Sequence, residues 1–363
     1  MSMRGFRMVL IAGGGLGLLA LVYYFGADSI ASALMHVTWW QFLLICLVHS
    51  FNVVVDSYGW RYAITTDRAP FHRLVAARCA GDAVNAISAV AAVGGEATKA
   101  WLLRRDISYR ESVPSLIVSK TAEVVSQTLL LALGVVLAWT TPALGPALRT
   151  AMLYLLVVEL IGASGFLGVQ VAGAVGKAGR VLTWVGGRGV RHVQQLDEAL
   201  RGFYRQQWPR FVVSVGLYFV GWLLGAVQGV LILGSLGLPG SLVTATIIEA
   251  LWSAVRFATF FVPASLGTLE GAVAAAFGAF GFSAGAGLAF TLVRRASQAV
   301  WIGVGMIVLM AMRPAAPVLA REQAEPVASS RTRGAPLDRF PADPLHRLVG
   351  QRSSVHHAPR SAL

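Results

Sequence analysis

The chain has 363 residues, of which 56% are hydrophobic and only 13% are charged, and its formal net charge is +13. A soluble globular domain of this composition would expose too much apolar surface to water, so the composition predicts an all-α, polytopic integral membrane protein. The arginines lie in the loops and the C-terminal tail between apolar runs, as membrane topology requires. The positive charge therefore does not indicate nucleic acid as a partner.

Motifs for cofactor or hydrolytic chemistry are absent from the sequence. The two cysteines, Cys46 and Cys79, have no C-x-x-C or Cys/His spacing, so neither a disulfide framework nor a zinc site is expected. No Ser-His-Asp arrangement and no phosphate-binding glycine loop is recognisable. We therefore expect no cofactor, no metal and no ATP hydrolysis.

Six apolar runs are long enough to cross a bilayer, which takes about 17 to 25 helical residues. The predicted spans are residues 8–25, 39–58, 113–139, 151–171, 211–236 and 288–312. Residues 173–210, between the fourth and fifth spans, predict a basic cytoplasmic linker with an amphipathic helix near 190–203. In the fifth span Gly221, Gly225 and Gly229 are four residues apart, which predicts a face for close helix packing.

A small-residue segment at 80–103 is too polar for a lipid-facing span and too apolar for a loop. It contains Asp82, Glu96 and Lys99 among alanines and glycines. We predict that it forms part of a re-entrant hairpin, which enters from the cytoplasm and breaks at Gly94 and Gly95.

A second broken segment runs from 242 to 281. Pro263 and Gly267 interrupt it, and Gly271 is a further candidate hinge glycine. A helix break leaves backbone polar groups free, and a membrane tolerates them only where they are buried in protein or line a cavity. The segment is therefore predicted to form a second re-entrant hairpin.

The distribution of Lys and Arg predicts the orientation of the spans. The short loops at 26–37, 140–150 and 237–241 hold one Arg in total, whereas the other loops and both ends are basic. By the positive-inside rule, the N- and C-termini are both on the cytoplasmic side of a bacterial inner membrane. The second hairpin then enters and leaves on the outer side. Eight full spans is the alternative.

Ionisable residues occur inside these apolar segments. A charge at the centre of a membrane helix costs about 2.5–3.5 kcal/mol even on a lenient insertion scale, so it normally faces a partner or a water-filled cavity. Candidates for a polar, gated substrate site are Glu96, Lys120, Glu123, Glu249, Arg256, Glu270, Arg294 and Arg295. Lys120, Glu123 and Gln127 share one helical face by their spacing. Glu159 in the fourth span also needs a partner. The alternative is that these residues form buried pairs that only stabilise the bundle.

One spacing relates the two halves of the chain. Glu96 precedes Lys120 by 24 residues, and Glu270 precedes Arg294 by 24. Each Glu follows a glycine-bearing break, and each cation lies in the helix after a hairpin. Because the hairpins enter from opposite sides, the pattern predicts an inverted repeat, which in secondary transporters places the substrate near the midplane.

Longer motifs resemble a known family. Residues 249–273 read E-A-L-W-S-A-V-R-F-A-T-F-F-V-P-A-S-L-G-T-L-E-G-A-V, and L-V-R-R-A-S-Q follows at 292–298. With the earlier G-D-A-V-N, V-G-G-E-A-T-K-A-W-L-L and S-K-T-A-E-V-V-S-Q, they are similar to the membrane domain of the lysylphosphatidylglycerol synthase/flippase-like family. The similarity covers residues 8 to 313 and is greatest to the hopanoid-biosynthesis-associated branch. Ala264 and Ser265 depart from the glycine that usually follows Pro263.

The resemblance implies that the chain moves a lipid between leaflets. In this reading the cations attract a polar headgroup, the acids balance them in the empty site, and the hairpins alternate its exposure. One alternative is a membrane enzyme that modifies a lipid headgroup, with Glu249 or Glu270 as general base. Another is a scaffold for lipid-biosynthetic enzymes, which would then be its partners.

The C-terminal tail differs in composition from the rest. Residues 313–363 are rich in Arg, Pro, Ala and Ser and poor in large apolar residues, which predicts a disordered cytoplasmic tail. The predicted organisation is therefore a transmembrane domain at 1–312 followed by this tail, which we expect to be too short and too polar for a catalytic module.

Overall fold

Ten α-helices form all the regular structure that the computed structural model describes, which covers residues 35–66, 69–87, 93–142, 144–171, 190–260, 262 and 265–312. The helices are α3 (Trp39–Ala63), α4 (Phe71–Ile87), α5 (Val93–Leu102), α6 (Tyr109–Thr140), α7 (Pro146–Val171), α9 (Val190–Gln206), α10 (Trp208–Ser235), α11 (Leu242–Ala258), α12 (Thr268–Ala279) and α13 (Ala284–Ala311). The predicted span at 8–25 and the tail at 313–363 lie outside the described residues. The all-α prediction is confirmed for the rest.

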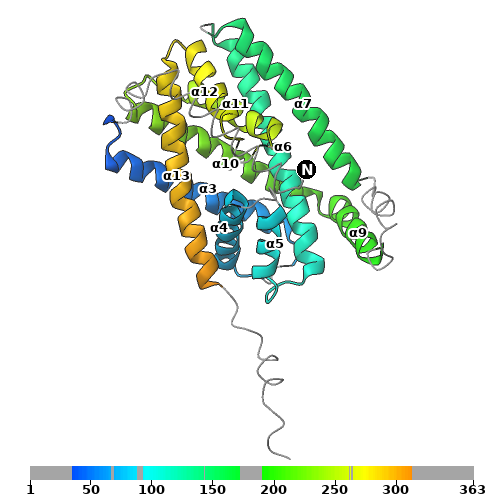
Figure 1. Cartoon of the computed structure of the whole chain (residues 1–363). Helices are drawn as coiled ribbons and strands as arrows, with labels where there is room; N and C mark the ends of the chain where they lie inside the picture. The colour runs from blue at the N-terminus through cyan, green and yellow to red at the C-terminus, as the bar shows by residue number, and fades with distance from the viewer. Residues whose placement is uncertain are drawn as a thin grey trace, which may run out of the picture. The chain divides into compact units, whose positions relative to one another are not determined.

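Five of the described helices, α3, α6, α7, α10 and α13, are long and apolar enough to cross a membrane. They coincide with five of the six predicted spans, and each begins up to five residues earlier or ends up to five later than predicted. The chain is thus a multi-pass membrane protein. In Figure 1, α7 lies along the outside of the bundle beside α6, and α13 runs beside α4.

Local sequence explains where several helices begin. Thr38 accepts a hydrogen bond from the Gln41 backbone N–H, and the Gln41 side chain accepts one from the Thr38 backbone, which together form a capping box before α3. Ser241 and Ser283 cap α11 and α13 by accepting backbone N–H bonds three residues ahead. Such caps satisfy amide groups that have no partner inside the helix.

Glycines bring the helices close together. A Cβ at Gly134 of α6 would lie 2.3 Å from the Cβ of Ala250 in α11, and one at Gly305 of α13 would lie 2.3 Å from the Cys79 carbonyl oxygen in α4. In α10, a Cβ at Gly225 would meet a Glu249 carboxylate oxygen at 2.6 Å. The close packing predicted for the glycine face of α10 is confirmed.

The amphipathic helix predicted near 190–203 is α9. Leu200 and Phe203 on its apolar face are buried in one cluster with Trp60 and Leu74. Because the bundle covers these side chains, this part of the apolar face does not need lipid to bury it.

The break in the segment at 80–103 does not lie where it was predicted. Gly94 and Gly95 lie inside α5, while α4 ends at Ile87, so a break at the two glycines is wrong. Gly95 serves close packing instead: its N–H donates to Asn85 Oδ1 at 2.8 Å, and a Cβ there would lie 2.2 Å from the Gly81 carbonyl oxygen. Glycine inside a helix is less favourable than alanine by about 1 kcal/mol, but the close contact with Gly81 leaves no room for a Cβ at Gly95.

The second broken segment has the predicted interruption. Helix α11 ends at Ala258 and α12 begins at Thr268. Gly267 caps α12 with φ at +79°, a left-handed conformation that favours glycine. Gly271 lies within α12, where its backbone is helical, and its role as a hinge stays a prediction. Pro263 lies outside the described residues.

Candidate functional site

A cavity of about 180 Å³ lies among the helices α6, α10 and α11. Its lining residues are Lys120, Glu123, Val124 and Gln127 of α6, Trp222 of α10, and Arg256 and Phe257 of α11. Three of the eight predicted site residues therefore meet here, from segments more than 130 positions apart in the chain. Val124, Trp222 and Phe257 give the cavity apolar and aromatic walls, and Gln127 adds a polar amide, a mixture that is typical of ligand sites.

The cavity lining carries one surplus positive charge. Lys120 Nζ lies 3.0 Å from Glu123 Oε2, and both side chains are partly exposed, so this pair is close to neutral. Among the described residues Arg256 has no ion-pair partner. A cavity with apolar walls and an unbalanced guanidinium attracts an anion, and the planar guanidinium suits phosphate or carboxylate oxygens.

Gln127 links the cavity to a buried acid on α7. Its Nε2 donates to Glu159 Oε1 at 2.9 Å and lies 3.3 Å from the Ser253 carbonyl oxygen of α11. Thr128 also donates to Glu159 Oε1, at 3.3 Å. The partner that Glu159 needs is thus a pair of neutral donors rather than a cation.

Glu249 and Arg294 form a buried, bidentate ion pair. The two terminal nitrogens of Arg294 donate to the two oxygens of Glu249, with the Nη2–Oε1 distance at 2.7 Å. The guanidinium carbon lies 4.4 Å from the centre of the Trp252 ring, which adds a cation–π contact. Both charged side chains are less than 10% exposed, so the pair forms a buried link between α11 and α13.

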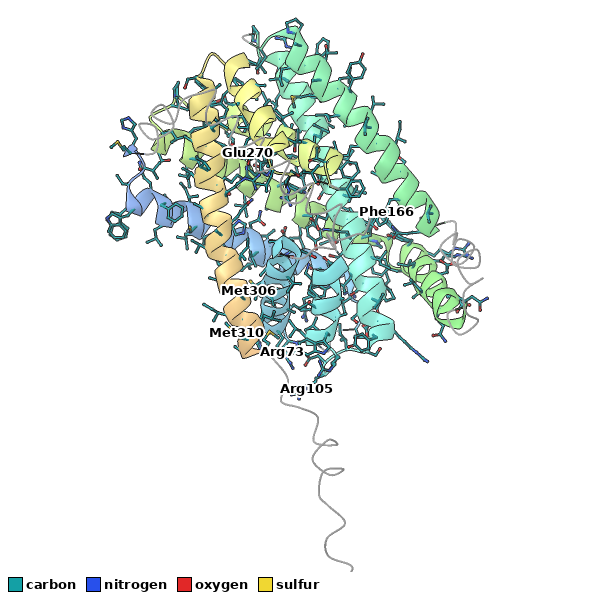
Figure 2. The ribbon with its side chains drawn as sticks, viewed as in Figure 1. Arg73, Arg105, Phe166, Glu270, Met306 and Met310 are labelled. Atoms are coloured by element: carbon teal, nitrogen blue, oxygen red, sulfur yellow. The ribbon has the colours of Figure 1, made fainter. Side chains whose placement is uncertain are left out.

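Glu270 and Arg295 form a second pair. Arg295 Nε donates to Glu270 Oε1 at 2.5 Å, while Glu270 Oε2 accepts the Gly267 N–H at 2.8 Å. Glu270 lies inside the bundle, as Figure 2 shows, and its residue is 0% exposed. The carboxylate thus joins α12 to α13 and caps the first turn of α12. Neither of these two pairs lines the cavity.

A third set of charges connects α3, α4 and α5. Arg78 lies 2.8 Å from Asp56 and 3.4 Å from Asp82, and Lys99 lies 2.9 Å from Asp82 and 3.0 Å from Glu96. Glu96 therefore pairs with Lys99 rather than with the cation 24 residues further on, and Glu270 likewise pairs with Arg295. The 24-residue spacing does not correspond to contacts between its members.

The sequence analysis missed two members of this third set. Neither Asp56 nor Arg78 was among the predicted site residues, yet Arg78 is 8% exposed and also donates to Tyr218 Oη at 3.2 Å. Tyr218 Oη in turn lies 2.5 Å from Ser119 Oγ. The one available sign was the position of Asp56 inside an apolar run, since a membrane-embedded acid needs a partner.

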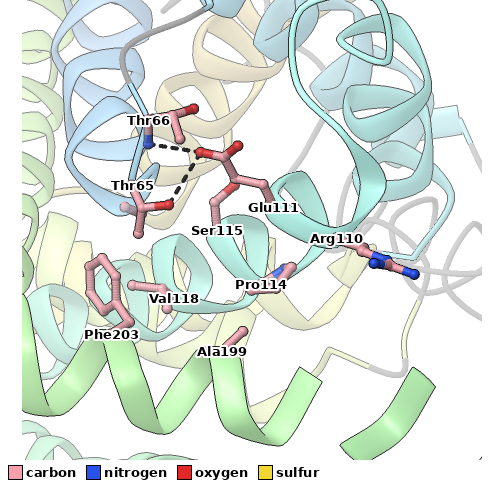
Figure 3. Close-up of a pocket in the computed structure, with 10 residues that line it drawn as sticks. Thr65, Thr66, Arg110, Glu111, Pro114, Ser115, Val118, Ala199 and Phe203 are labelled. Carbon is pink, nitrogen blue, oxygen red and sulfur yellow. Dashed lines mark hydrogen bonds between the residues drawn. The ribbon is translucent and has the colours of Figure 1, made fainter. Parts of the chain in front are cut away.

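A second cavity, of about 190 Å³, lies between α6, α9 and the end of α3. Figure 3 shows Glu111 near its wall, where its Oε1 accepts the Thr66 N–H at 2.8 Å and the Thr65 hydroxyl at 3.2 Å. Arg110 is the one cation among its lining residues. None of the predicted site residues lines it.

In the described part of the chain, no group of three His, Cys, Asp or Glu residues is placed to hold an ion.

Comparison with known proteins identifies the family. The model of the lysylphosphatidylglycerol synthase TM region matches residues 8–305, most of the chain. No curated protein and no solved structure is significantly similar to it. The match covers the cavity, the three sets of charges and the broken segment between α11 and α12. The chain therefore belongs to the family of the lysylphosphatidylglycerol synthase TM region.

Proposed function

We propose that the protein is a lipid translocator that moves an anionic-headgroup lipid between leaflets without ATP hydrolysis. Its family ties it to lipid modification or transport. The observation that carries the proposal is the cavity of Lys120, Glu123 and Arg256, with its surplus positive charge and aromatic walls. The cavity holds the headgroup, and the acyl or polycyclic tails remain in the bilayer.

The lengths of the short helices support two re-entrant hairpins. Helices α11 and α12 have 17 and 12 residues, or about 26 and 18 Å at 1.5 Å per residue, short of the ~30 Å hydrocarbon core. Helices α4 and α5 have 17 and 10 residues. A pair of such helices reaches into the membrane and returns to the same side.

The packing of the hairpins supports an inverted repeat. Helix α4 of the first hairpin packs against α13, and α11 of the second packs against α6. Each hairpin thus contacts the long helix that follows the other hairpin. Movement of one half against the other would alternate the exposure of a site between them.

The orientation is part of the proposal. Figure 2 shows Arg73 and Arg105 at the end of the bundle where α13 finishes beyond Met310. We assign this end to the cytoplasmic side of a bacterial inner membrane, because basic residues accumulate there.

The identity of the lipid headgroup is a more specific part of the proposal. Similarity to the hopanoid-associated branch makes a polar-headed hopanoid one candidate, and the charge of the cavity favours an anionic phospholipid headgroup. An enzyme with Glu249 or Glu270 as general base is less consistent with the geometry. In both carboxylates each oxygen already accepts a hydrogen bond, so neither oxygen is open to take a proton from a substrate.

The test is lipid movement in vesicles. Purified protein in phosphatidylcholine vesicles should expose fluorescent phosphatidylglycerol to an impermeant quencher, with fluorescent phosphatidylcholine as the neutral comparison. Arg256→Gln should slow movement of the anionic probe about tenfold or more, since a hydrogen bond to a charged group is worth about 1.5–3 kcal/mol. Arg105→Gln, an exposed arginine of equal charge, is the matched control.

Three outcomes would count against the proposal. A change in the mass of the lipid points to the enzyme. Equal rates for Arg256→Gln and the wild type remove the cavity from the mechanism. Failure of the wild type to move either phospholipid probe points to the scaffold, in which case loop deletions rather than Arg256→Gln would alter lipid synthesis in cells.

A further inference from the structure

Glu159 is an acid without a counter-ion in the middle of a membrane helix. It lies near the centre of α7, and its residue is 1% exposed although α7 is otherwise largely uncovered by the bundle. By contrast, Glu249 and Glu270, which are also buried in the bundle, each form an ion pair with an arginine. Glu159 forms no ion pair within the described part of the chain.

The hydrogen bonds of Glu159 fit a neutral carboxylic acid. Oε1 accepts from Gln127 and Thr128, whereas Oε2 is buried and has no hydrogen-bond partner among the residues that the structure describes. An ionised oxygen left without donor or solvent in a membrane interior is strongly disfavoured, and such groups neutralise instead. A proton on Oε2 removes the charge and leaves both observed hydrogen bonds in place.

The proton site is adjacent to the proposed headgroup cavity. Gln127 lines the cavity and donates to Glu159, so a single amide separates the two. Among the described residues, ionisable side chains that line the cavity or contact α7 from a neighbouring helix include Lys120, Glu123, Arg256 and Tyr204. Tyr204 reaches α7 at Gln170, and Lys120 is engaged with Glu123.

We propose that Glu159 is the proton-binding site that couples proton movement to headgroup binding in the cavity. The inference rests on the proposed function. With Glu159 protonated, the cavity keeps its surplus positive charge and binds an anionic headgroup. With Glu159 ionised, its negative charge offsets Arg256 and the headgroup binds less tightly. Coupling is reciprocal, so the bound anion also favours the proton, and the two move in the same direction.

The first test measures the proton directly. Infrared spectra of the purified wild-type protein at neutral pH should contain the carbonyl stretch of a protonated carboxylic acid, and Glu159→Gln should remove that component. Glu198→Gln, at an exposed position on α9, should leave it unchanged. If the wild-type minus Glu159→Gln difference contains no protonated-acid band, the proton site is overturned, while lipid movement as such is unaffected.

The second test measures the coupling. In vesicles with fluorescent phosphatidylglycerol, a gradient of one pH unit should shift the leaflet ratio by up to about tenfold for one coupled proton, with accumulation on the alkaline side. Glu159→Gln should still equilibrate the probe but lose the effect of the gradient. Movement that ignores the gradient in the wild type overturns the coupling and leaves the translocator intact. A wild-type protein that moves no lipid would contradict both the translocator function and the proton coupling.

Discussion

Arg294 of α13 donates to both carboxylate oxygens of Glu249 of α11 through the two terminal nitrogens of its guanidinium. The guanidinium also lies over the ring of Trp252. The sequence analysis placed both residues in a substrate site, whereas in the structure each satisfies the other. Removing one partner of a buried pair leaves an uncompensated charge, which typically destabilises by about 3–5 kcal/mol.

Glu249→Gln should therefore destabilise the protein. The midpoint of thermal unfolding in detergent should fall markedly, because Arg294 would keep its charge in a buried position. The double variant Glu249→Leu with Arg294→Leu should recover most of the loss, since it buries no charge. A Glu249→Gln variant as stable as the wild type would show that the pair does not stabilise the fold. Both residues would then again be candidates for contact with the substrate.

The contact of α6 with α11 depends on the absence of a side chain at Gly134. Gly134→Ala would place its Cβ 2.3 Å from the Ala250 Cβ, and overpacking of this kind costs typically 1–3 kcal/mol. A lower unfolding midpoint is expected. The second-site variant Ala250→Gly should restore it, because the remaining close neighbour is the flexible end of Met152 at 3.3 Å.

Gly303 provides the control for this packing argument. It also lies in a membrane helix, and a Cβ there would meet nothing within 4 Å. Gly303→Ala should leave the midpoint unchanged. Equal losses at Gly134 and Gly303 would mean that glycine itself, rather than the helix contact, is required.

The two glycines at the start of α12 should respond differently to alanine. Gly267 has φ at +79°, so Gly267→Ala should destabilise by about 1–2 kcal/mol and slow lipid movement if the cap of α12 positions the broken segment. Gly271 is helical with open space around its Cα, so Gly271→Ala should be neutral or slightly stabilising. The thermal unfolding midpoint and the rate of lipid movement in vesicles should be measured for both variants and compared. Similar effects at both would contradict the assignment of the special backbone to Gly267 alone.

Cysteine labelling tests the orientation. Helix α6 has 32 residues, about 48 Å at 1.5 Å per residue, so Arg105 before it and Ala147 after it lie on opposite sides of a membrane that it crosses. In a background without Cys46 and Cys79, Ala147→Cys should react with an impermeant maleimide in intact spheroplasts. Arg105→Cys should react only after the membrane is opened. The reverse pattern would invert the topology.

The spans and the interrupted segment before α12 were predictable because they depend on local chemistry. Long apolar runs form helices in a membrane, since only internal hydrogen bonds satisfy their backbone there. The glycine spacing in α10 likewise predicted close packing. The break of the first hairpin was misplaced, because the same glycine pair can serve either a turn or a close contact, and only the neighbouring Asn85 and Gly81 show which.

The sequence by itself determined that this is a helical membrane protein with charges inside the bilayer, since composition and periodicity follow from what lipid accepts. It did not determine which charge meets which. Arg256 and Lys120 share a cavity, Arg294 is held by Glu249, and Glu159 is left with neutral donors. The pairing of these charged residues depends on which helices touch and at what register, because helix packing brings together residues that are far apart in the chain.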